Sequence, residues 1–530
     1  MGDDARAKRI KLEDELPLRD GVGGEDVGPD LMTRCLNDDM LGCIVTRLPT
    51  KDAARTQILS SRWKPLWRSA PLNLEAKVTS YVHLSHIQRI LSTHQGHVHR
   101  FSLKTLTCPW RQFPSMDSML ESMKLDMLEV LEIYVQAEDE VEAFVGCYFL
   151  SHKRMHSYSC FLYISIREEV ASCVPPKFSR VHVQCLVYRV FGLWAKPTQA
   201  WNLLLPPSML RFSSTLCVLI LGKGFQLPSE STATFNFPRL KELTLMDIKT
   251  SESALHEFLA GCPVLESLLL DKNMGCRRLH ISSLTLRSIG VSYGEKGKVG
   301  KLEELIIENA PRLEKLIPRV PNYGLVIRVI QAPRLRTLGY LHDDIITVEL
   351  GNMLFEKMVP DNLSNVMRSV KILALITAPN LDVIIGFLKC FPCVQKLYIV
   401  SYTRITLKNE QPYTSLECLD RHLKTLHIAN YEEERSNINF IKFFVLNAKV
   451  LEYIKFVCRD QCDPKWIASQ HKKLQVNDRA SRDARFDFEA NSNCLSSSLV
   501  HMKHIHDSAM DPFDGSLCRC NAVAAAYRTG

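Results

Sequence analysis

The stretch LNDDMLGCIVTRLPTKDAARTQILSSRWKPLWRSAPL, residues 36–72, holds three short helix patterns in succession. Asp38 and Asp39 can cap the first helix, whose apolar residues recur every three or four positions, and Pro49 ends it. The second pattern follows this proline directly. Pro65 removes a backbone N–H donor from the third pattern, so we expect that helix to be short. The stretch therefore predicts three consecutive short helices.

Helices of this length need a partner, because isolated helices of about ten residues are marginal in water. Trp63 and Trp67 fall on one face of the third helix, and large aromatic side chains dominate the energetics of interfaces. Two partners are open at this point, another protein or the rest of this chain. Periodicity alone does not choose between them.

Two motifs within the stretch resemble a known family. LPTKDA at residues 48–53 and LSxRWxxLW at residues 59–67 are similar to the F-box of the plant F-box proteins that carry leucine-rich repeats and a C-terminal FBD domain. That family begins its first helix with Leu-Pro-Asp, whereas this chain has Leu36-Asn37-Asp38, and Asn is itself a good cap. The resemblance implies that the stretch docks on the Skp adaptor of a cullin-type ubiquitin ligase.

A set of apolar side chains would form that docking surface. The resemblance assigns adaptor binding to Leu36, Leu41, Ile44, Leu48, Pro49, Ile58, Leu59, Trp63, Leu66 and Trp67. The stretch also carries six Lys and Arg residues against three Asp residues, a net charge of +3 that favours an acidic partner. A solvated helix surface would show the same charges, so charge alone does not identify the partner.

Further along the chain, the pattern apolar-x-x-apolar-x-apolar occurs twelve times. Its alternate spacing is typical of a short strand with inward-pointing residues. The matches begin at Val98, Leu128, Leu216, Leu240, Leu265, Leu286, Leu302, Leu335, Val370, Val394, Leu423 and Leu451. Several lie 21 to 29 residues apart, which is the period of leucine-rich repeats.

Amphipathic segments lead into several of these strands. Residues 253–260 are amphipathic, Gly261-Cys262-Pro263 ends the segment, and a strand pattern follows; the same order recurs at residues 384–392. Stacked units of one strand and one helix form a curved solenoid whose strands line an extended face suited to a macromolecule. We therefore expect an α/β fold in which a three-helix F-box precedes an irregular leucine-rich-repeat solenoid.

The C-terminal part resembles the FBD domain. The resemblance rests on HLKTL at residues 422–426, FIKFFVLNA at 440–448, and RAS at 479–481 followed by two phenylalanines. Their order predicts a strand, an amphipathic helix, a strand and a final helix-to-strand segment that closes the solenoid as an end-cap. An acidic run replaces the family's usual Gly-containing turn at residues 430–435.

These patterns divide the chain into five parts. We expect a disordered tail at 1–30, the F-box at 31–75, leucine-rich repeats at 76–415, an FBD-like domain at 416–488 and a disordered tail at 489–530. The repeat spacing breaks down at 137–200, a stretch rich in Cys, Tyr and Phe that we treat as an irregular insertion.

The chain lacks the sequence motifs of an enzyme. It contains no P-loop, no dinucleotide fingerprint, no G-x-S-x-G and no H-E-x-x-H. Cys518 and Cys520, with His501, His504 and His506 nearby, form the one cluster that resembles metal ligands, and no second Cys pair accompanies it. We therefore expect no catalytic residue, no cofactor and no metal site.

Charge and hydropathy favour a soluble protein inside the cell. The 66 basic and 58 acidic residues are spread along the chain, so the net charge of +8 does not point to nucleic acid. No apolar run approaches the roughly 18 residues of a membrane span, so we expect no membrane contact. Lys8, Arg9 and Lys11 form a basic run that is typical of a nuclear import signal or of a solvated tail. We expect the protein in nucleus and cytoplasm.

The resemblance implies a substrate-recognition subunit of an SCF (Skp-cullin-F-box) ubiquitin ligase. The F-box would bind the Skp adaptor and through it a cullin, and the repeats would hold an unknown protein for ubiquitination. Such a subunit is no enzyme, and it acts by holding its target close to the ubiquitin carrier. One alternative is a non-degradative nuclear scaffold. An enzyme stays possible only if the insertion at 137–200 contains a pocket.

Overall fold

Two compact units make up the chain in the computed structural model, Met1–Ala70 and Pro71–Gly530. The structure describes residues 36–48, 50–78, 81–105, 119–135, 203–205, 207–222, 225–228, 235–292, 300–318, 324–342, 345–401, 416–458, 462–490 and 502–514. Pro49, the basic run at residues 8–11 and the insertion expected at 137–200 lie outside these ranges.

Three helices form the described part of the first unit. They are α2 (Asp38–Arg47), α3 (Thr50–Arg55), which continues as the 3-10 helix η1 (Thr56–Ile58), and α4 (Trp63–Ser69). The amide of Met40 donates to the side-chain oxygen of Asn37 at 2.9 Å, so Asn37 caps α2. The expectation that Asp38 and Asp39 cap this helix is wrong by one residue, because both lie in its first turn. The seven residues of α4 confirm the short third helix.

These helices pack around one small apolar core. The core consists of Leu41, Val45, Ala53, Trp63 and Ala70, with Leu36, Leu48, Leu66 and Trp67 packed against it. Arg62 adds hydrogen bonds between the helices. Its guanidinium donates to the Asp38 carboxylate at 2.7 Å and to the Leu36 carbonyl at 2.7 Å. The start of α4 is thereby held against the start of α2.

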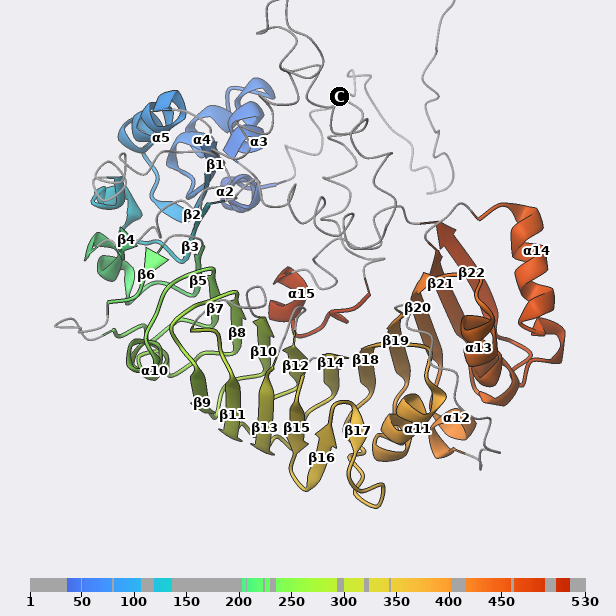
Figure 1. The fold of residues 1–530 in the computed structure, drawn as a ribbon. Coiled ribbons are helices and arrows are strands. Elements are labelled where there is room, and N and C mark those ends of the chain that lie inside the picture. Colours follow the sequence, from blue (N-terminus) through green and yellow to red (C-terminus); the bar gives the residue numbers. More distant parts are fainter. Residues whose placement is uncertain are drawn as a thin grey trace, which may run out of the picture. The chain divides into compact units, whose positions relative to one another are not determined.

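A fourteen-stranded sheet, called here the large sheet, runs through the second unit (Figure 1). Its strands, in spatial order, are β1 (Leu72–Val78), β2 (Val98–Thr105), β3 (Val130–Val135), β5 (Val218–Leu221), β7 (Glu242–Met246), β8 (Ser267–Asp271), β10 (Ser288–Ser292), β12 (Lys315–Pro318), β14 (Thr337–His342), β18 (Ile372–Thr377), β19 (Lys396–Ser401), β20 (Thr425–Tyr431), β21 (Tyr453–Cys458) and β22 (Arg485–Ala490). All neighbours in it are parallel, so successive repeats each add a strand in chain order. Eleven of the twelve predicted strands lie in this sheet, and the α/β repeat fold is confirmed.

The strand predicted at residues 302–307 lies in a second sheet instead. This six-stranded sheet consists of β9 (Arg278–Ser282), β11 (Glu304–Asn309), β13 (Val326–Gln331), β15 (Thr347–Leu350), β16 (Met353–Glu356) and β17 (Val359–Pro360). Along the chain, β9 to β15 alternate with β8 to β14 of the large sheet. These repeats therefore carry two strands where we expected a strand and a helix. RLHIS at 278–282 alternates exposed and buried residues, which is the signal of a strand.

Helices replace the second strand in other repeats. They are α5 (Tyr81–Thr93), α10 (Glu252–Ala260), α11 (Leu381–Cys390), α12 (Glu417–Arg421), α13 (Arg435–Asn447) and α14 (Pro464–Lys473). The helices predicted at 253–260 and 384–392 are thus confirmed as α10 and α11. Gly261 ends α10 where a Cβ would lie 2.1 Å from the carbonyl oxygen of Phe235, so a larger residue does not fit.

Shorter elements complete the second unit. They are η3 (Met123–Leu125), β4 (Leu203–Leu204), η4 (Pro207–Phe212), β6 (Phe225–Gln226), η5 (Val476–Asp478) and α15 (Met502–His506). Within the described ranges, every helix is too short or too polar to cross a membrane.

The FBD-like part extends the large sheet. β20, β21 and β22 add three parallel strands, with α13 and α14 between them, in the predicted order. Asn430, in the acidic run, has φ = 57°. Asn adopts this left-handed conformation more readily than most residues, so it can take the place of the family's glycine. The rings of Phe456 and Phe488 stack at 4.4 Å and hold β22 on the sheet.

The expectation of a disordered tail over 489–530 is wrong for residues 489–490, which end β22, and for residues 502–514, which we call the C-terminal segment. This segment consists of α15 and a following loop, and it lies against the large sheet (Figure 1). Its Ile505 and Phe513 are buried. The segment has two apolar anchors without helical or strand periodicity, so a search for periodic patterns does not detect it.

Candidate functional site

Among the described residues of the first unit, four large apolar side chains are exposed. Met40 and Ile44 of α2 are 54% and 43% exposed, and Ile58 of η1 and the adjacent Leu59 are 83% and 64% exposed. Apolar side chains of this size gain about 1.5–3 kcal/mol each when a partner buries them. Met40 is not among the residues predicted from the sequence to bind an adaptor, although its spacing of four residues from Ile44 places both on one face of α2. These four residues form the exposed apolar surface of the first unit.

Nine of the ten residues predicted to bind an adaptor are described, all but Pro49, and they fall into three groups. Leu41 and Trp63 are core residues, Leu36, Leu48, Leu66 and Trp67 are half-buried around the core, and Ile44, Ile58 and Leu59 are exposed. The core pair is 0% and 5% exposed, so it supports the packing of the helices rather than offering contact area to a partner. The exposed residues are free to make such contacts. Adaptor contact itself stays a prediction for all ten residues.

The large sheet has two faces with different side chains. In β8, Leu268 and Leu270 point to the face that carries the repeat leucines, and Leu269 points to the other, which we call the inner face. One row on the inner face runs through Thr244, Leu269, Gly290 and Ile317 on neighbouring strands. Figure 1 shows the strands following an arc, with α15 on its inner side.

An apolar patch lies in the middle of the inner face. This inner-face patch consists of Leu269, Ile317, Tyr340, Ala374, Ile376, Tyr398 and Val400, and it forms one buried cluster with Ile505 and Phe513 of the C-terminal segment. The solvent-facing side of a strand is ordinarily polar. A contiguous apolar patch at such positions marks a surface that binds something.

The helix α15 places Ile505 on this patch. Ile505 is fully buried and lies over Gly290 and beside Leu269. A Cβ added at Gly290 would lie 2.9 Å from Cδ1 of Ile505 and 2.9 Å from Cδ1 of Leu269. The absence of a side chain at Gly290 therefore makes the space that Ile505 fills.

His506 forms the polar contacts of the helix. Its Nε2 lies 2.7 Å from the hydroxyl of Thr244, and its Nδ1 lies 2.8 Å from the hydroxyl of Ser267. Burial lowers the pKa of His506 to about 4, so the imidazole is neutral at physiological pH. Two hydroxyls satisfy a neutral imidazole in either tautomer, since each can donate or accept.

Lys315 holds the backbone of the loop. Its amine donates to the carbonyl oxygens of Asp507 and Met510, at 2.6 Å each. Burial lowers the pKa of Lys315, and the nearby carboxylates of Asp507 and Asp511 oppose that shift. These hydrogen bonds go to main-chain atoms of a loop that bends at residues 508–510, so they do not depend on the identity of the side chains there.

The end of the segment binds through a carboxylate and a ring. Asp511 accepts from the amine of Lys396 and from the hydroxyl of Tyr398, both at 2.9 Å. The ring of Phe513 packs on those of Tyr340 and Tyr398, with centroids 4.8 and 5.4 Å apart. These contacts select an acidic side chain followed two residues later by an aromatic one.

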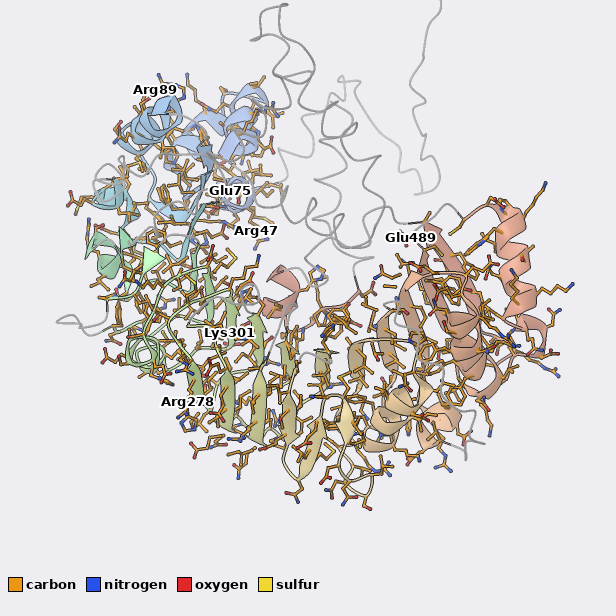
Figure 2. All side chains as sticks on the ribbon, viewed as in Figure 1. Arg47, Glu75, Arg89, Arg278, Lys301 and Glu489 are labelled. Atoms are coloured by element: carbon orange, nitrogen blue, oxygen red, sulfur yellow. The ribbon has the colours of Figure 1, made fainter. Side chains whose placement is uncertain are left out.

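Charges elsewhere on the second unit have both signs. Glu489 lies at the end of β22 (Figure 2), and on the inner face its carboxylate lies 2.6 Å from the amine of Lys455. Arg278 lies on β9 of the second sheet (Figure 2), and its guanidinium lies 3.7 Å from the carboxylate of Glu304. These ion pairs differ from the one-sided basic stripe that is typical of a nucleic-acid interface.

The cluster of possible metal ligands near the C-terminus is described only in part. His504 is buried, and both ring nitrogens of His506 make hydrogen bonds to hydroxyls. His501, Cys518 and Cys520 lie outside the described residues. Among the side chains that the structure places, no three of His, Cys, Asp or Glu are grouped so as to hold a metal ion.

Three family models match the chain. The F-box domain matches residues 34–75, "FBD-associated F-box protein At5g56370, LRR repeats" matches residues 180–399, and FBD matches residues 411–456. The first covers α2 to α4, the second covers the elements from β4 to α11, and the third covers α12, β20 and α13. The domain order therefore agrees with the fold.

Similar proteins come from Arabidopsis thaliana. The chain is 26% identical over 306 residues to an FBD-associated F-box protein, a match that covers 56% of this chain and 51% of that protein. It is 23% identical to F-box/LRR-repeat protein 13, covering 76% of this chain and 78% of that protein. It is 24% identical to an F-box/FBD/LRR-repeat protein, a match that covers 79% of this chain and 82% of that protein. The chain thus spans about half the length of the first of these relatives.

Proposed function

Because this chain carries the F-box, leucine-rich repeats and FBD domain of the F-box/FBD/LRR-repeat proteins in that order, we propose that it is the substrate-recognition subunit of an SCF ubiquitin ligase. In this proposal the F-box binds a Skp-type adaptor and through it a cullin. The repeats hold the protein to be ubiquitinated. The chain makes and breaks no bonds itself.

The exposed apolar surface of the first unit carries this proposal. Ile58 and Leu59 are adjacent, and each exposes more than half of its side chain to solvent. They lie within the residues that match the F-box model. Burying such a pair against an adaptor supplies binding energy that the isolated unit does not use. The local charge of +3 adds attraction to an acidic partner.

The proposed mechanism is proximity. An adaptor on the F-box and a target on the repeats are held in one complex, so a lysine of the target stays near the ubiquitin carrier. Tethering of this kind converts a bimolecular encounter into an intramolecular one and raises the effective concentration to about the millimolar range. The rate gain then depends on how long the target stays bound, and the repeats supply that contact.

Adaptor binding by exposed-surface variants tests the proposal. The full chain is mixed with a Skp-type adaptor, and Ile58→Asp with Leu59→Asp is compared with wild type by pull-down and titration. We expect adaptor affinity to fall at least about tenfold, because two buried apolar contacts are lost. Leu284→Asp is the matched control, since Leu284 is 66% exposed and lies in the second unit. Equal adaptor binding by the double variant and wild type contradicts the proposal.

Localisation is a separate part of the proposal. We propose that the protein enters the nucleus through the basic run Lys8, Arg9 and Lys11 and is also present in the cytoplasm. A fluorescent fusion of the full chain with all three residues changed to Ala is expected to lose its nuclear fraction. An unchanged nuclear fraction contradicts the role of this run.

A further inference from the structure

We propose that the inner face between β7 and β19 is a peptide-binding site, that residues 502–514 occupy it as an internal ligand, and that a partner protein binds there through a segment in which a carboxylate precedes an aromatic ring by two residues. The identification of this partner with the protein to be ubiquitinated rests on the proposed function. The binding site itself does not.

The contacts of the C-terminal segment define what the site recognises. Two side-chain positions lie close together: Asp511 reaches Lys396 and Tyr398, and Phe513 reaches Tyr340 and Tyr398. Tyr398 serves both, with its hydroxyl on the carboxylate and its ring on the phenyl group. The site therefore requires an acid and an aromatic residue at a fixed spacing.

A third side-chain position lies nearer the start of the segment. Ile505 fills the space over Gly290, six residues before Asp511. Between the two, Lys315 donates to the main-chain carbonyl oxygens of Asp507 and Met510. A ligand for the whole site thus has an aliphatic anchor, a hydrogen-bonding side chain at the position of His506, a short connecting stretch and then the acid–x–aromatic pair.

The C-terminal segment is a ligand of the sheet rather than a layer of its core. It contributes no strand to the sheets of the described chain, and its helix has five residues, too few to be stable alone in water. The aliphatic residues of the repeat pattern, such as Leu268 and Ile289, are buried on the opposite face. Removing the segment would therefore uncover the inner-face patch while the repeat core stays intact.

Covalent attachment makes the internal ligand a strong competitor. A segment tethered to its own site acts at an effective concentration on the order of millimolar. A partner segment with the same contacts must overcome this competition. We therefore expect it to bind weakly while the C-terminal segment is docked and tightly once that segment is released. The C-terminal segment thus keeps the inner-face patch covered until a ligand of higher affinity displaces it.

Peptide exchange on the full chain tests this inference. The probe is a fluorescent synthetic peptide of residues 502–514, MKHIHDSAMDPFD, and binding is read as fluorescence anisotropy. Asp511→Asn with Phe513→Ala in the chain weakens the internal ligand, and we expect this release variant to bind the probe at least tenfold more tightly than wild type does. Ser508→Ala is the matched control, because Ser508 is exposed within the segment. Equal affinity of the release variant and wild type overturns the inference.

Two further variants locate the binding at the inner face. In the release variant, Gly290→Val fills the space for Ile505, and Lys315→Met removes the donor to the loop carbonyls. Each is expected to weaken probe binding at least tenfold, and their thermal unfolding midpoints show whether the sheet is intact. If Gly290→Val lowers that midpoint, its probe affinity is set aside, and the probe affinity of Lys315→Met alone tests whether the probe binds at the inner face. Undiminished probe binding by an intact variant overturns the inference.

A probe with Asn and Ala in place of its acid and its phenylalanine tests the ligand chemistry. We expect it to bind the release variant at least tenfold more weakly than the original probe, and equal binding overturns the acid–x–aromatic requirement. Adaptor pull-down is measured on the same samples. Adaptor binding without probe exchange removes this inference alone, whereas probe exchange without adaptor binding removes the proposed function and leaves the peptide site.

Discussion

The amine of Lys396 lies 2.9 Å from a carboxylate oxygen of Asp511, although 115 positions of sequence separate the two residues. Lys396 stands on β19, within the leucine-rich repeats, and Asp511 belongs to the C-terminal segment. Tyr398, two residues along the same strand, donates to the same oxygen. The end of the described chain therefore covers the face that the repeats build.

A charge exchange across this pair should be reversible. Lys396→Glu places two acids together, and we expect hydrogen exchange of the amides in residues 502–514 to accelerate about 10- to 100-fold, because a charge-assisted hydrogen bond contributes about 1.5–3 kcal/mol. Asp511→Lys in the same chain should restore much of the protection. Lys424→Glu is the control, since it breaks an exposed pair with Glu452, and these two residues lie just before β20 and β21. A double variant as unprotected as Lys396→Glu would contradict the pairing.

Docking of the C-terminal segment should weaken as the pH falls. Burial lowers the pKa of His506 to about 4, whereas in the released segment the pKa is near its ordinary value of 6.5. The docked state therefore has its full stability above pH 6.5 and loses it as the pH falls from there toward 4. Between pH 7.5 and 5.5 we expect about a tenfold weaker docking equilibrium, measured by hydrogen exchange with correction for the intrinsic pH dependence of exchange.

His506→Gln should remove this pH dependence. His506 contacts the neutral hydroxyls of Thr244 and Ser267, and its chain neighbour Asp507 interacts with Glu242 on β7. The pKa of Glu242 is raised, first by burial and then by nearby carboxylates, so its protonation acts in the opposite direction. Glu242→Gln in both chains isolates the histidine. A pH dependence that persists in Glu242→Gln with His506→Gln would show that another group is responsible.

Core and surface variants of the first unit should behave differently. Leu41→Ala and Trp63→Ala remove buried side chains, and we expect each to lower the free energy of unfolding of this unit by about 2–5 kcal/mol. Ile58→Ala should change it by less than about 0.5 kcal/mol. Hydrogen exchange of α2 amides in increasing denaturant measures all three in the full chain. Equal losses for Ile58→Ala and Leu41→Ala would contradict the assignment of core and surface.

Two glycine substitutions with the same chemistry should have opposite effects. Gly261→Ala brings a methyl group to 2.1 Å from the carbonyl oxygen of Phe235, so the backbone must shift, and we expect a loss of about 1–3 kcal/mol in the second unit. Gly42→Ala in α2 meets no atom within 4 Å and should stabilise the first unit by about 0.5–1 kcal/mol. Denaturant unfolding followed by hydrogen exchange in each unit separates the two. Stabilisation by Gly261→Ala would show that the close approach is relieved at no cost.

The repeats were predictable to the extent that their signals are local. Leu268 and Leu270, two positions apart, identify β8 from spacing alone, and the same pattern recurs along the large sheet. RLHIS at 278–282 carries an equally short alternation, but it lies between two repeat matches where a helix was expected. This segment becomes β9 because it pairs with β11, which in turn pairs with β13. These partners lie in other repeats, so the sheet that replaces the helices could not be assigned from one segment.

The candidate adaptor surface shows the same division. Leu41 and Ile44 lie three residues apart in α2 and carry similar side chains, yet one is fully buried and the other is 43% exposed. Helical spacing groups both on an apolar face. The position of Trp63 against Leu41 decides which of them becomes core, and that contact joins separate helices.

Motifs and periodic spacing were sufficient to identify the F-box helices, the repeat strands and the FBD-like end, because each signal is contained within a few tens of residues. Long-range contacts were needed to show what covers the inner face. Ile505, Asp511 and Phe513 have no periodicity of their own, and they become a ligand only because Gly290, Lys396 and Tyr340 come together on neighbouring repeats. Such a site is a property of the folded sheet, since no single repeat contains it.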